Sequence, residues 1–228
     1  MEKASRDEQN KKSKMLHPVI VIGMCLGVFC IGFSVGLMRI AHFGTDPFSC
    51  MNLGLKSFLP ISYGTCQLLV NIILLLIMLL TFRKSIGLGT LVNMAGCGYA
   101  ADFTVWVLGM FHITAESMNG NIVLRLLFMF AGVLLLGFGA ALYMQCDIGI
   151  APYDALGSII EHSTHGKVKF QWARIGTDVT CVAIGFFAGS VVGIATVVTA
   201  FFTGPLVTFF RNILGKMRIF SVVQNEME

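Results

Sequence analysis

Long apolar stretches separated by short polar ones dominate the chain. Val19 to Leu37 and Leu126 to Met144 each carry no charged residue over 19 positions, close to the roughly 20 residues that cross about 30 Å of hydrocarbon. Val179 to Phe210 is uncharged over 32 positions, and a single helix of that length would extend about 48 Å. This stretch is therefore expected to fold back on itself at Gly189 to Gly193.

The pattern predicts six membrane-spanning helices. Composition supports this, because 56% of the residues are hydrophobic and 12% are charged, against about a quarter charged in soluble proteins. We therefore expect an integral membrane protein that is embedded in the lipid bilayer. The predicted spans are residues 18–41, 63–82, 88–110, 123–145, 170–189 and 192–211.

Lysine and arginine predict the direction of insertion, because cytoplasmic loops carry an excess of both. With six spans, four basic clusters fall on one side of the membrane. The other side receives Lys56, and the segments 111–121 and 189–193 contain no lysine or arginine. Both termini are thus expected in the cytoplasm, and the membrane is expected to be the bacterial inner (plasma) membrane. The clusters are Lys3, Arg6, Lys11, Lys12 and Lys14; Arg83 and Lys84; Lys167 and Lys169; and Arg211, Lys216 and Arg218.

The two halves of the chain repeat each other. A shift of 105 residues aligns the first spans, and a shift of 106 aligns IGLGTLVN at 86–93 with VGIATVVT at 192–199. Because three spans is an odd number, the second half enters the membrane from the opposite face, as in many transporters. The aligned pairs include Gly32 with Gly137, Leu37 with Leu142, Gly44 with Gly149, Pro47 with Pro152, Gly87 with Gly193 and Thr90 with Thr196.

The predicted fold is an all-α polytopic membrane protein with six transmembrane helices in two inverted three-helix repeats, each containing a short Pro-initiated broken or re-entrant helix. The predicted organisation is a basic cytoplasmic segment at 1–16, a first repeat at 17–111, an external loop at 112–122, a second repeat at 123–212 and a cytoplasmic tail at 213–228.

Each repeat is interrupted after its first span, by FGTDPFSC at 43–50 and by IGIAPYDA at 148–155. A helix restarts at Pro47 or Pro152, where the missing N–H costs nothing. The short helices, to Phe58 and about His162, cannot span the bilayer. Helix N-termini carry free N–H groups and roughly half a positive charge, so two ends arriving from opposite faces would frame a binding site. The alternative is a pair of corners with helices on the membrane surface, in which Asp46 and Asp154 only start the helices.

Polar residues within the spans are further candidates, because ionisable groups in lipid are costly and usually face a bundle interior. Arg174 and Asp178 are spaced i, i+4 and can neutralise each other. Gln67 and Asn71 occupy the equivalent positions in the first half. They form either a polar strip along a central cavity or a structural interhelical pair. Asp102 is a candidate for a proton relay or for solute contact, or else bonds to a lipid headgroup or to another helix.

Two expectations concern the first span. Arg39 is expected to extend its charge to the outer membrane surface. The Gly-x-x-x-Gly pairs Gly23 and Gly27, and Gly32 and Gly36, lie roughly opposite each other at about 100° per residue. The first span should therefore pack closely against neighbours on two sides.

Several segments resemble the YczE/YyaS/YitT-like bacterial membrane proteins, and the YczE branch in particular. The similar stretches are GFSVGLMRIAHFGTDPFSC, YGTCQLLVNI, IGLGTLVN, GFGAALYMQCDIGIAPYDAL and FFTGPLV, which together cover about residues 20–212. The resemblance implies a multi-span inner-membrane protein and supplies no substrate. One departure is Ala195, which stands where the first repeat has Gly89.

The expected function is a small transporter or permease for a small polar or anionic solute, with its site at the repeat interface. The alternative is a non-transporting membrane subunit or scaffold of a larger uptake or biosynthetic complex, and a homo-oligomer or protein partner is left open. No enzyme activity, cofactor, metal site or nucleic-acid binding is expected, because no catalytic set, Cys-x-x-Cys spacing or basic patch away from the membrane is present. The predicted solute or ion pathway comprises Asp46, Pro47, Gln67, Asn71, Asp102, Pro152, Asp154, Arg174 and Asp178.

Overall fold

The computed structural model describes residues 18–81, 83–118 and 120–216, which form eight α-helices, one short 3₁₀ turn and no strand. The predicted segment 1–16 and the tail beyond residue 216 lie outside the described residues. The elements are α2 (Pro18–Ala41), α3 (Pro47–Ser57), α4 (Tyr63–Thr81), η1 (Arg83–Ser85), α5 (Leu88–Met110), α6 (Ile122–Cys146), α7 (Pro152–Ser163), α8 (Phe170–Phe187) and α9 (Ile194–Gly215).

Five of these helices, α2, α4, α5, α6 and α9, are long and apolar enough to cross a membrane. Large apolar side chains such as Leu80, Phe130 and Phe201 are exposed on the outside of the molecule. Such an outer surface suits hydrocarbon, where apolar side chains lose nothing by facing the solvent. The protein is therefore an integral membrane protein with transmembrane helices, as predicted.

The sixth predicted span, α8, is less apolar than the other five. It has 18 residues, but Gln171, Arg174 and Asp178 lower its hydropathy, and it is not among the helices apolar enough to span. The polar side chains thus reduce the very signal that identifies a span. The six-span topology stays a prediction, with five spans supported by length and composition.

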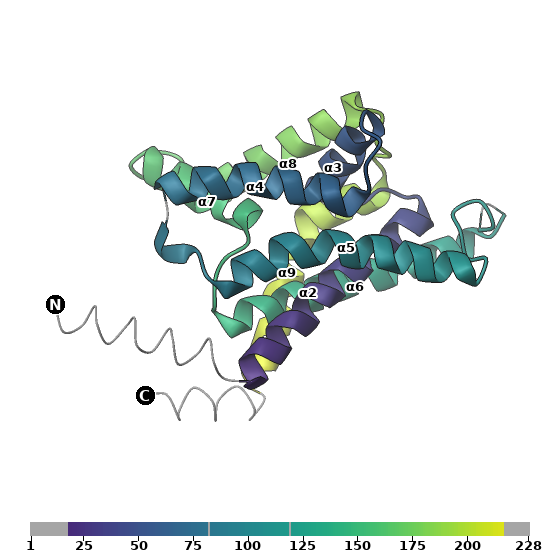
Figure 1. Ribbon diagram of the computed structural model, residues 1–228, viewed down its shortest axis with the longest axis horizontal. Coiled ribbons are helices and arrows are strands. Elements are labelled where there is room, and N and C mark those ends of the chain that lie inside the picture. The colour runs from purple at the N-terminus through teal and green to yellow at the C-terminus, as the bar shows by residue number, and fades with distance from the viewer. Residues whose placement is uncertain (1–17, 82, 119, 217–228) are drawn as a thin grey trace.

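The helices form two layers (Figure 1). In one layer, α2 packs against α5 and α6, and α9 packs against α6. In the other layer, α3 packs against α8, and α7 packs against α4 and α8. The layers meet along α4 and α5, whereas α8 contacts α9 only lightly. Figure 1 shows α3 and α7 toward opposite ends of the second layer.

Glycines on α2 permit close contact with neighbours on two sides. A Cβ added to Gly27 would lie 2.8 Å from the backbone nitrogen of Tyr143 on α6. A Cβ on Gly32 would lie 2.5 Å from the Ala100 Cβ on α5, and Gly36 also meets α5. Contacts this short leave no room for a side chain. The prediction that α2 packs closely on two sides is confirmed for these three positions.

Each helix break contains two residues in the left-handed region, namely the residue that directly follows the helix, His42 or Asp147, and a glycine two positions later. Helix α2 ends at Ala41 and α6 ends at Cys146, a few residues before Pro47 and Pro152 restart the chain as helix. The φ angle is +93° at Gly44 and +132° at Gly149, which glycine adopts at little cost because it lacks a Cβ. The proline then begins the short helix at a position where its missing N–H is not needed.

Reciprocal backbone contacts between the two halves hold the breaks. The Ala195 N–H donates to the Phe43 carbonyl at 2.9 Å, and the Gly89 N–H donates to the Ile148 carbonyl at 3.0 Å. In each case, the residue before the left-handed glycine meets the first turn of α9 or α5 in the other half. Because these bonds involve only backbone atoms, Ala195 makes the same contact as Gly89 despite the difference in side chain.

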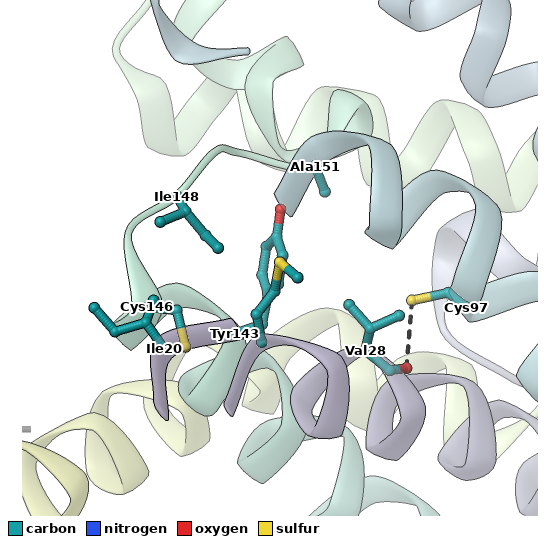
Figure 2. Close-up of a cluster of buried hydrophobic side chains, with 8 residues drawn as sticks. Ile20, Val28, Cys97, Tyr143, Cys146, Ile148 and Ala151 are labelled. Carbon is teal, nitrogen blue, oxygen red and sulfur yellow. Dashed lines mark hydrogen bonds between the residues drawn. The ribbon is translucent and has the colours of Figure 1, made fainter. Parts of the chain in front are cut away.

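An apolar cluster packs the break between α6 and α7 against α2, α5 and α6 (Figure 2). Tyr143 points from α6 toward the break, where Ile148 and Ala151 lie, and its hydroxyl donates to the Gly149 carbonyl at 3.0 Å. Burial of these side chains fixes the position at which α7 starts. The cluster consists of Ile20, Met24, Val28, Cys97, Tyr143, Cys146, Ile148 and Ala151.

Candidate functional site

The short helices α3 and α7 begin next to each other inside the protein. The rings of Phe48 and Tyr153, each the second residue of its helix, stack with their centroids 4.4 Å apart and their planes at 22°. Both rings are buried, as are Pro47 and Pro152, whereas the helices end at exposed residues. The two helices thus start in the interior and run outward, so their partially positive N-termini share one region.

The two helix starts are capped differently. Asp46 is the N-cap of α3, and its Oδ1 accepts the Ser49 N–H at 3.1 Å. The repeat places Ala151 at the corresponding position of α7, which has no side-chain cap. Instead, α7 carries Asp154 in its first turn. At the start of α3, a carboxylate therefore accepts a hydrogen bond from a free backbone N–H group. The free N–H groups at the start of α7 have no such side-chain acceptor at the N-cap.

A charged cluster surrounds the start of α7. The Arg174 Nη1 lies 2.7 Å from Asp154 Oδ1, and its Nε lies 3.5 Å from Asp178 Oδ1. The Tyr153 hydroxyl donates to Asp178 Oδ1. The Arg174 guanidinium also covers the Tyr153 ring, 4.6 Å from the ring centroid, at a distance suited to a cation–π contact. The predicted pairing of Arg174 with Asp178 is confirmed, and Asp154 is a nearer partner.

Asp102 lies in a separate ion pair with Arg39. The Arg39 Nη1 is 2.8 Å from Asp102 Oδ1, and the Gly64 N–H donates to Asp102 Oδ2 at 2.7 Å. The expectation that Arg39 extends to the membrane surface is wrong, because its side chain is only 15% exposed and turns inward to this carboxylate. Paired with a cation, Asp102 costs far less to place at this depth than an isolated carboxylate would.

A chain of hydrogen bonds and ring contacts links this ion pair to the start of α3. The Arg39 guanidinium lies 4.9 Å from the centroid of the Tyr63 ring. The Tyr63 hydroxyl donates to Ser49 Oγ at 2.8 Å, and the Ser49 N–H donates to Asp46. Polar contacts therefore run from α2 across α4 to the start of α3.

Gln67 and Asn71 lie along α4, 6% and 2% exposed. Gln67 Oε1 lies close to Gly98 of α5, where an added Cβ would be 2.9 Å away. No hydrogen bond joins either amide to Arg174 or Asp178 among the residues that the structure describes. Both are thus buried polar groups of the second layer, but they do not belong to the charged cluster.

A largely apolar cavity of about 450 Å³ adjoins the charged cluster. It lies between α3, α4, α7 and α8, and both stacked rings line it. None of the predicted charged candidates is among its lining residues. Tyr153 connects the two regions, because its ring lines the cavity while its hydroxyl bonds Asp178.

Sequence reasoning missed the tyrosines and the small polar residues of this region. Tyr153 lies between the predicted candidates Pro152 and Asp154. Its position in the first turn of the short helix could have identified it as a site residue. No sequence pattern pointed to Tyr63 or Ser49, because their roles follow from the packing of α3 on α4. A hydroxyl or amide on a short helix is common, and only the tertiary contact makes it part of a site.

In a comparison with known protein families, residues 20–212 match DUF6198, which is described as a family of unknown function. An uncharacterised protein of Haemophilus influenzae is 28% identical over 82% of this chain and 81% of its own length. Two Bacillus subtilis proteins are each 26% identical. They are the uncharacterised membrane protein YczE, aligned over 80% of this chain and 81% of its own length, and the uncharacterised protein YyaS, aligned over 84% and 92%. No solved structure matches the chain.

Proposed function

This chain belongs to DUF6198, a family of unknown function, and on that premise we propose that it is a small secondary transporter or permease for a small polar or anionic solute. The observation that carries the proposal is the meeting of the α3 and α7 N-termini inside the molecule beside Asp154, Arg174 and Asp178. Transport sites are commonly formed by broken helices whose ends face the protein interior, together with ionisable side chains within the membrane.

The proposal includes an inverted repeat of two three-helix units. It is supported by the reciprocal bonds Phe43 to Ala195 and Ile148 to Gly89, which join equivalent positions of the two halves. Helix α3 packs on α8, and α7 makes the equivalent but less extensive contact with α4. Phe48 and Tyr153, equivalent under the repeat, stack on each other, as expected for residues on a two-fold axis.

The proposed solute contacts are Arg174 and the uncapped start of α7. An anion would accept hydrogen bonds from this helix end and from the guanidinium. Arg174 is now held by Asp154 and Asp178, so solute binding would compete with these carboxylates and loosen the cluster. In this proposal Gln67, Asn71 and Asp102 belong to the pathway, and the protein moves its solute without chemical change.

The proposed setting is the cytoplasmic membrane of a bacterium, with six spans and both chain ends inside. The distribution of lysine and arginine supports this orientation. Among the described residues, Arg83, Lys167 and Lys169 lie at one end of the long helices, while Lys56 and Arg125 lie at the other end (Figure 1).

A second candidate function is that of a membrane subunit of a larger complex. It is favoured by α8, which contacts α9 only lightly and exposes Trp172, Phe186 and Phe187. Helix α8 packs on α3 and α7, so its exposed apolar face is the side that would gain from packing against a partner helix. In this case the charged cluster would fix α7 on α8 and would bind no solute.

Proteoliposomes that contain the purified protein alone test the first proposal. Osmotic swelling would be followed by light scattering in acetate, lactate, phosphate, glycine and glycerol. We expect at least one of these to enter faster than in empty liposomes. Asp178→Asn should reduce that rate about tenfold or more, because it removes the carboxylate that holds both Tyr153 and Arg174.

The matched control is Glu116→Gln, which likewise replaces a carboxylate by its amide, at an exposed residue of the loop between α5 and α6. This variant should keep the wild-type rate. A well-folded protein that passes none of the five solutes, and that co-purifies from native membranes with a stoichiometric partner, would favour the subunit instead.

A further inference from the structure

The cavity between α3, α4, α7 and α8 has a buried inner side and an open side along α8. Its volume of about 450 Å³ lies within the roughly 300–1,000 Å³ of small-ligand sites. Phe48, Tyr153 and Cys181 line its inner side and are buried. Trp172 and Ile184 of α8 also line it, but they are 69% and 40% exposed. The cavity therefore opens to the outer surface of the protein along α8.

The hydroxyl groups that line this cavity are already engaged within the protein. The Thr177 and Thr180 hydroxyls donate to carbonyls of their own helix at 2.8 and 2.7 Å. The Tyr153 hydroxyl donates to Asp178. Because the rest of the lining is mainly apolar, a polar solute would lose its hydration there and gain few hydrogen bonds in return. The lining thus favours an apolar occupant.

The length of the cavity matches one leaflet of a bilayer. Its lining residues on α8 extend from Trp172 to Ile184, which at 1.5 Å per residue is about 18 Å. Half of the 30 Å hydrocarbon core is about 15 Å. The neighbouring α8 residues Ile175, Val179 and Phe186 are apolar and exposed, as suits a surface in contact with lipid. A lipid acyl chain lying along α8 would supply the dispersion contacts that an empty cavity lacks.

The end of the cavity near the loop between α7 and α8 is basic. Val168 lines the cavity and lies between Lys167 and Lys169, which are both exposed. Glu161, near the end of α7, is the nearest acidic residue in the sequence, so two lysines against one glutamate leave a net positive charge. Trp172 lines the same end, and tryptophan concentrates where a membrane meets water. An anionic headgroup would be attracted to this end.

We propose that this cavity binds one acyl chain of a phospholipid with an anionic headgroup, whose phosphate meets Lys167 and Lys169. Basic sites between membrane helices on the cytoplasmic side are known to bind such headgroups, and the predicted orientation puts both lysines on that side. Lipid binding does not depend on the transport proposed above, because Arg174 is not among the residues that line the cavity.

Tryptophan fluorescence tests the site, because phospholipids with brominated acyl chains quench a tryptophan that they contact. The chain contains two tryptophans, and Trp106→Phe leaves Trp172 as the reporter. The detergent-purified protein would be titrated with brominated phosphatidylglycerol, which is anionic, or with brominated phosphatidylcholine. We expect saturable quenching by phosphatidylglycerol. Phosphatidylcholine should require a concentration at least about fivefold higher, the effect expected for a lysine near an anionic lipid.

Gly176→Leu fills the cavity without a collision. Gly176 lines the cavity, and among the described residues no atom lies within 4 Å of a Cβ added there. This variant should weaken the quenching about tenfold, because the acyl chain loses apolar contacts. Thr180→Phe, one turn further along α8, should do the same. The matched control is Gly204→Leu on α9, where the space around an added Cβ is equally open, and it should leave the quenching unchanged.

The headgroup contact has its own variant, Lys167→Gln combined with Lys169→Gln, which should bind the two lipids equally well. The proposal is overturned if Gly176→Leu and Thr180→Phe are both quenched like the wild-type protein, or if the two lipids quench the wild-type protein at the same concentration. It is also overturned if Gly176→Leu converts a dimer into a monomer in size-exclusion chromatography, because the cavity would then hold a helix of a second copy.

Discussion

At the scale of single residues, we expect the ion pair between Arg39 and Asp102 to stabilise the folded protein. Both side chains are largely buried, 15% and 26% exposed, and Asp102 also accepts the Gly64 N–H. Arg39→Leu leaves that carboxylate without its cation. Breaking a fully buried pair in this way costs 3–5 kcal/mol, and partial exposure reduces the expected loss to about 2 kcal/mol. Thermal unfolding in detergent should show a drop of about 4–8 °C.

The double variant Arg39→Leu with Asp102→Asn is the decisive comparison. The amide carries no charge, and its oxygen still accepts the Gly64 N–H, so the double variant should be more stable than Arg39→Leu alone. Losses that simply add would show that the two side chains do not interact energetically, and the ion pair would then not explain why a charge lies at this depth.

Residue pairings were the least predictable part of the site. Arg174 and Asp178 lie four positions apart, and helix geometry alone brings them together. Asp154 lies 20 positions before Arg174, and Arg39 lies 63 positions before Asp102. Such pairs follow only from the packing of α7 on α8 and of α2 on α5, which no local pattern specifies. The sequence could therefore nominate candidates without stating which of them meet.

At the scale of elements, the two breaks depend on glycine. A side chain at Gly44 or Gly149 would be strained by the positive φ angle and would also collide with Thr196 or Thr90. Gly44→Ala and Gly149→Ala should each cost at least 2 kcal/mol, because backbone strain of 1–2 kcal/mol adds to the collision. The melting temperature in detergent measures this cost, and folded yield by size-exclusion chromatography supplements it.

Gly109→Ala is the control for this prediction, because no atom lies within 4 Å of a Cβ added there and the residue is helical. Alanine in a helix should be neutral or stabilising by up to about 1 kcal/mol. If the variants at 44 and 149 were as stable as the one at 109, the breaks would not require a left-handed backbone.

Helix positions were predicted well where strong local signals mark them. Uncharged runs located α2, α6 and α9, and the two prolines located the first residues of α3 and α7. The weak case is α8, whose polar side chains reduce its hydropathy because they belong to the charged cluster. The charged cluster requires polar side chains on α8, whereas membrane insertion favours apolar ones. Hydropathy measures only the tendency to insert, so it underrates this helix.

At the scale of the whole molecule, the open question is how the two halves sit across the membrane. The reciprocal bonds at the two breaks involve equivalent positions, which two copies related by a two-fold axis would produce. Inverted copies place that axis in the membrane plane. The end of α3 and the end of α7 would then face opposite sides of the bilayer.

Labelling with a membrane-impermeant maleimide measures this arrangement in intact cells. Phe58, just after α3, and His165, just after α7, are both exposed, so single cysteines there would be accessible. Cys25 and Cys30 would first be replaced by alanine, since the other five native cysteines are buried. Phe58→Cys should react in intact cells, and His165→Cys only after permeabilisation. Reaction of both from the same side would rule out the inverted repeat, because two copies in the same orientation would send both short helices toward one face.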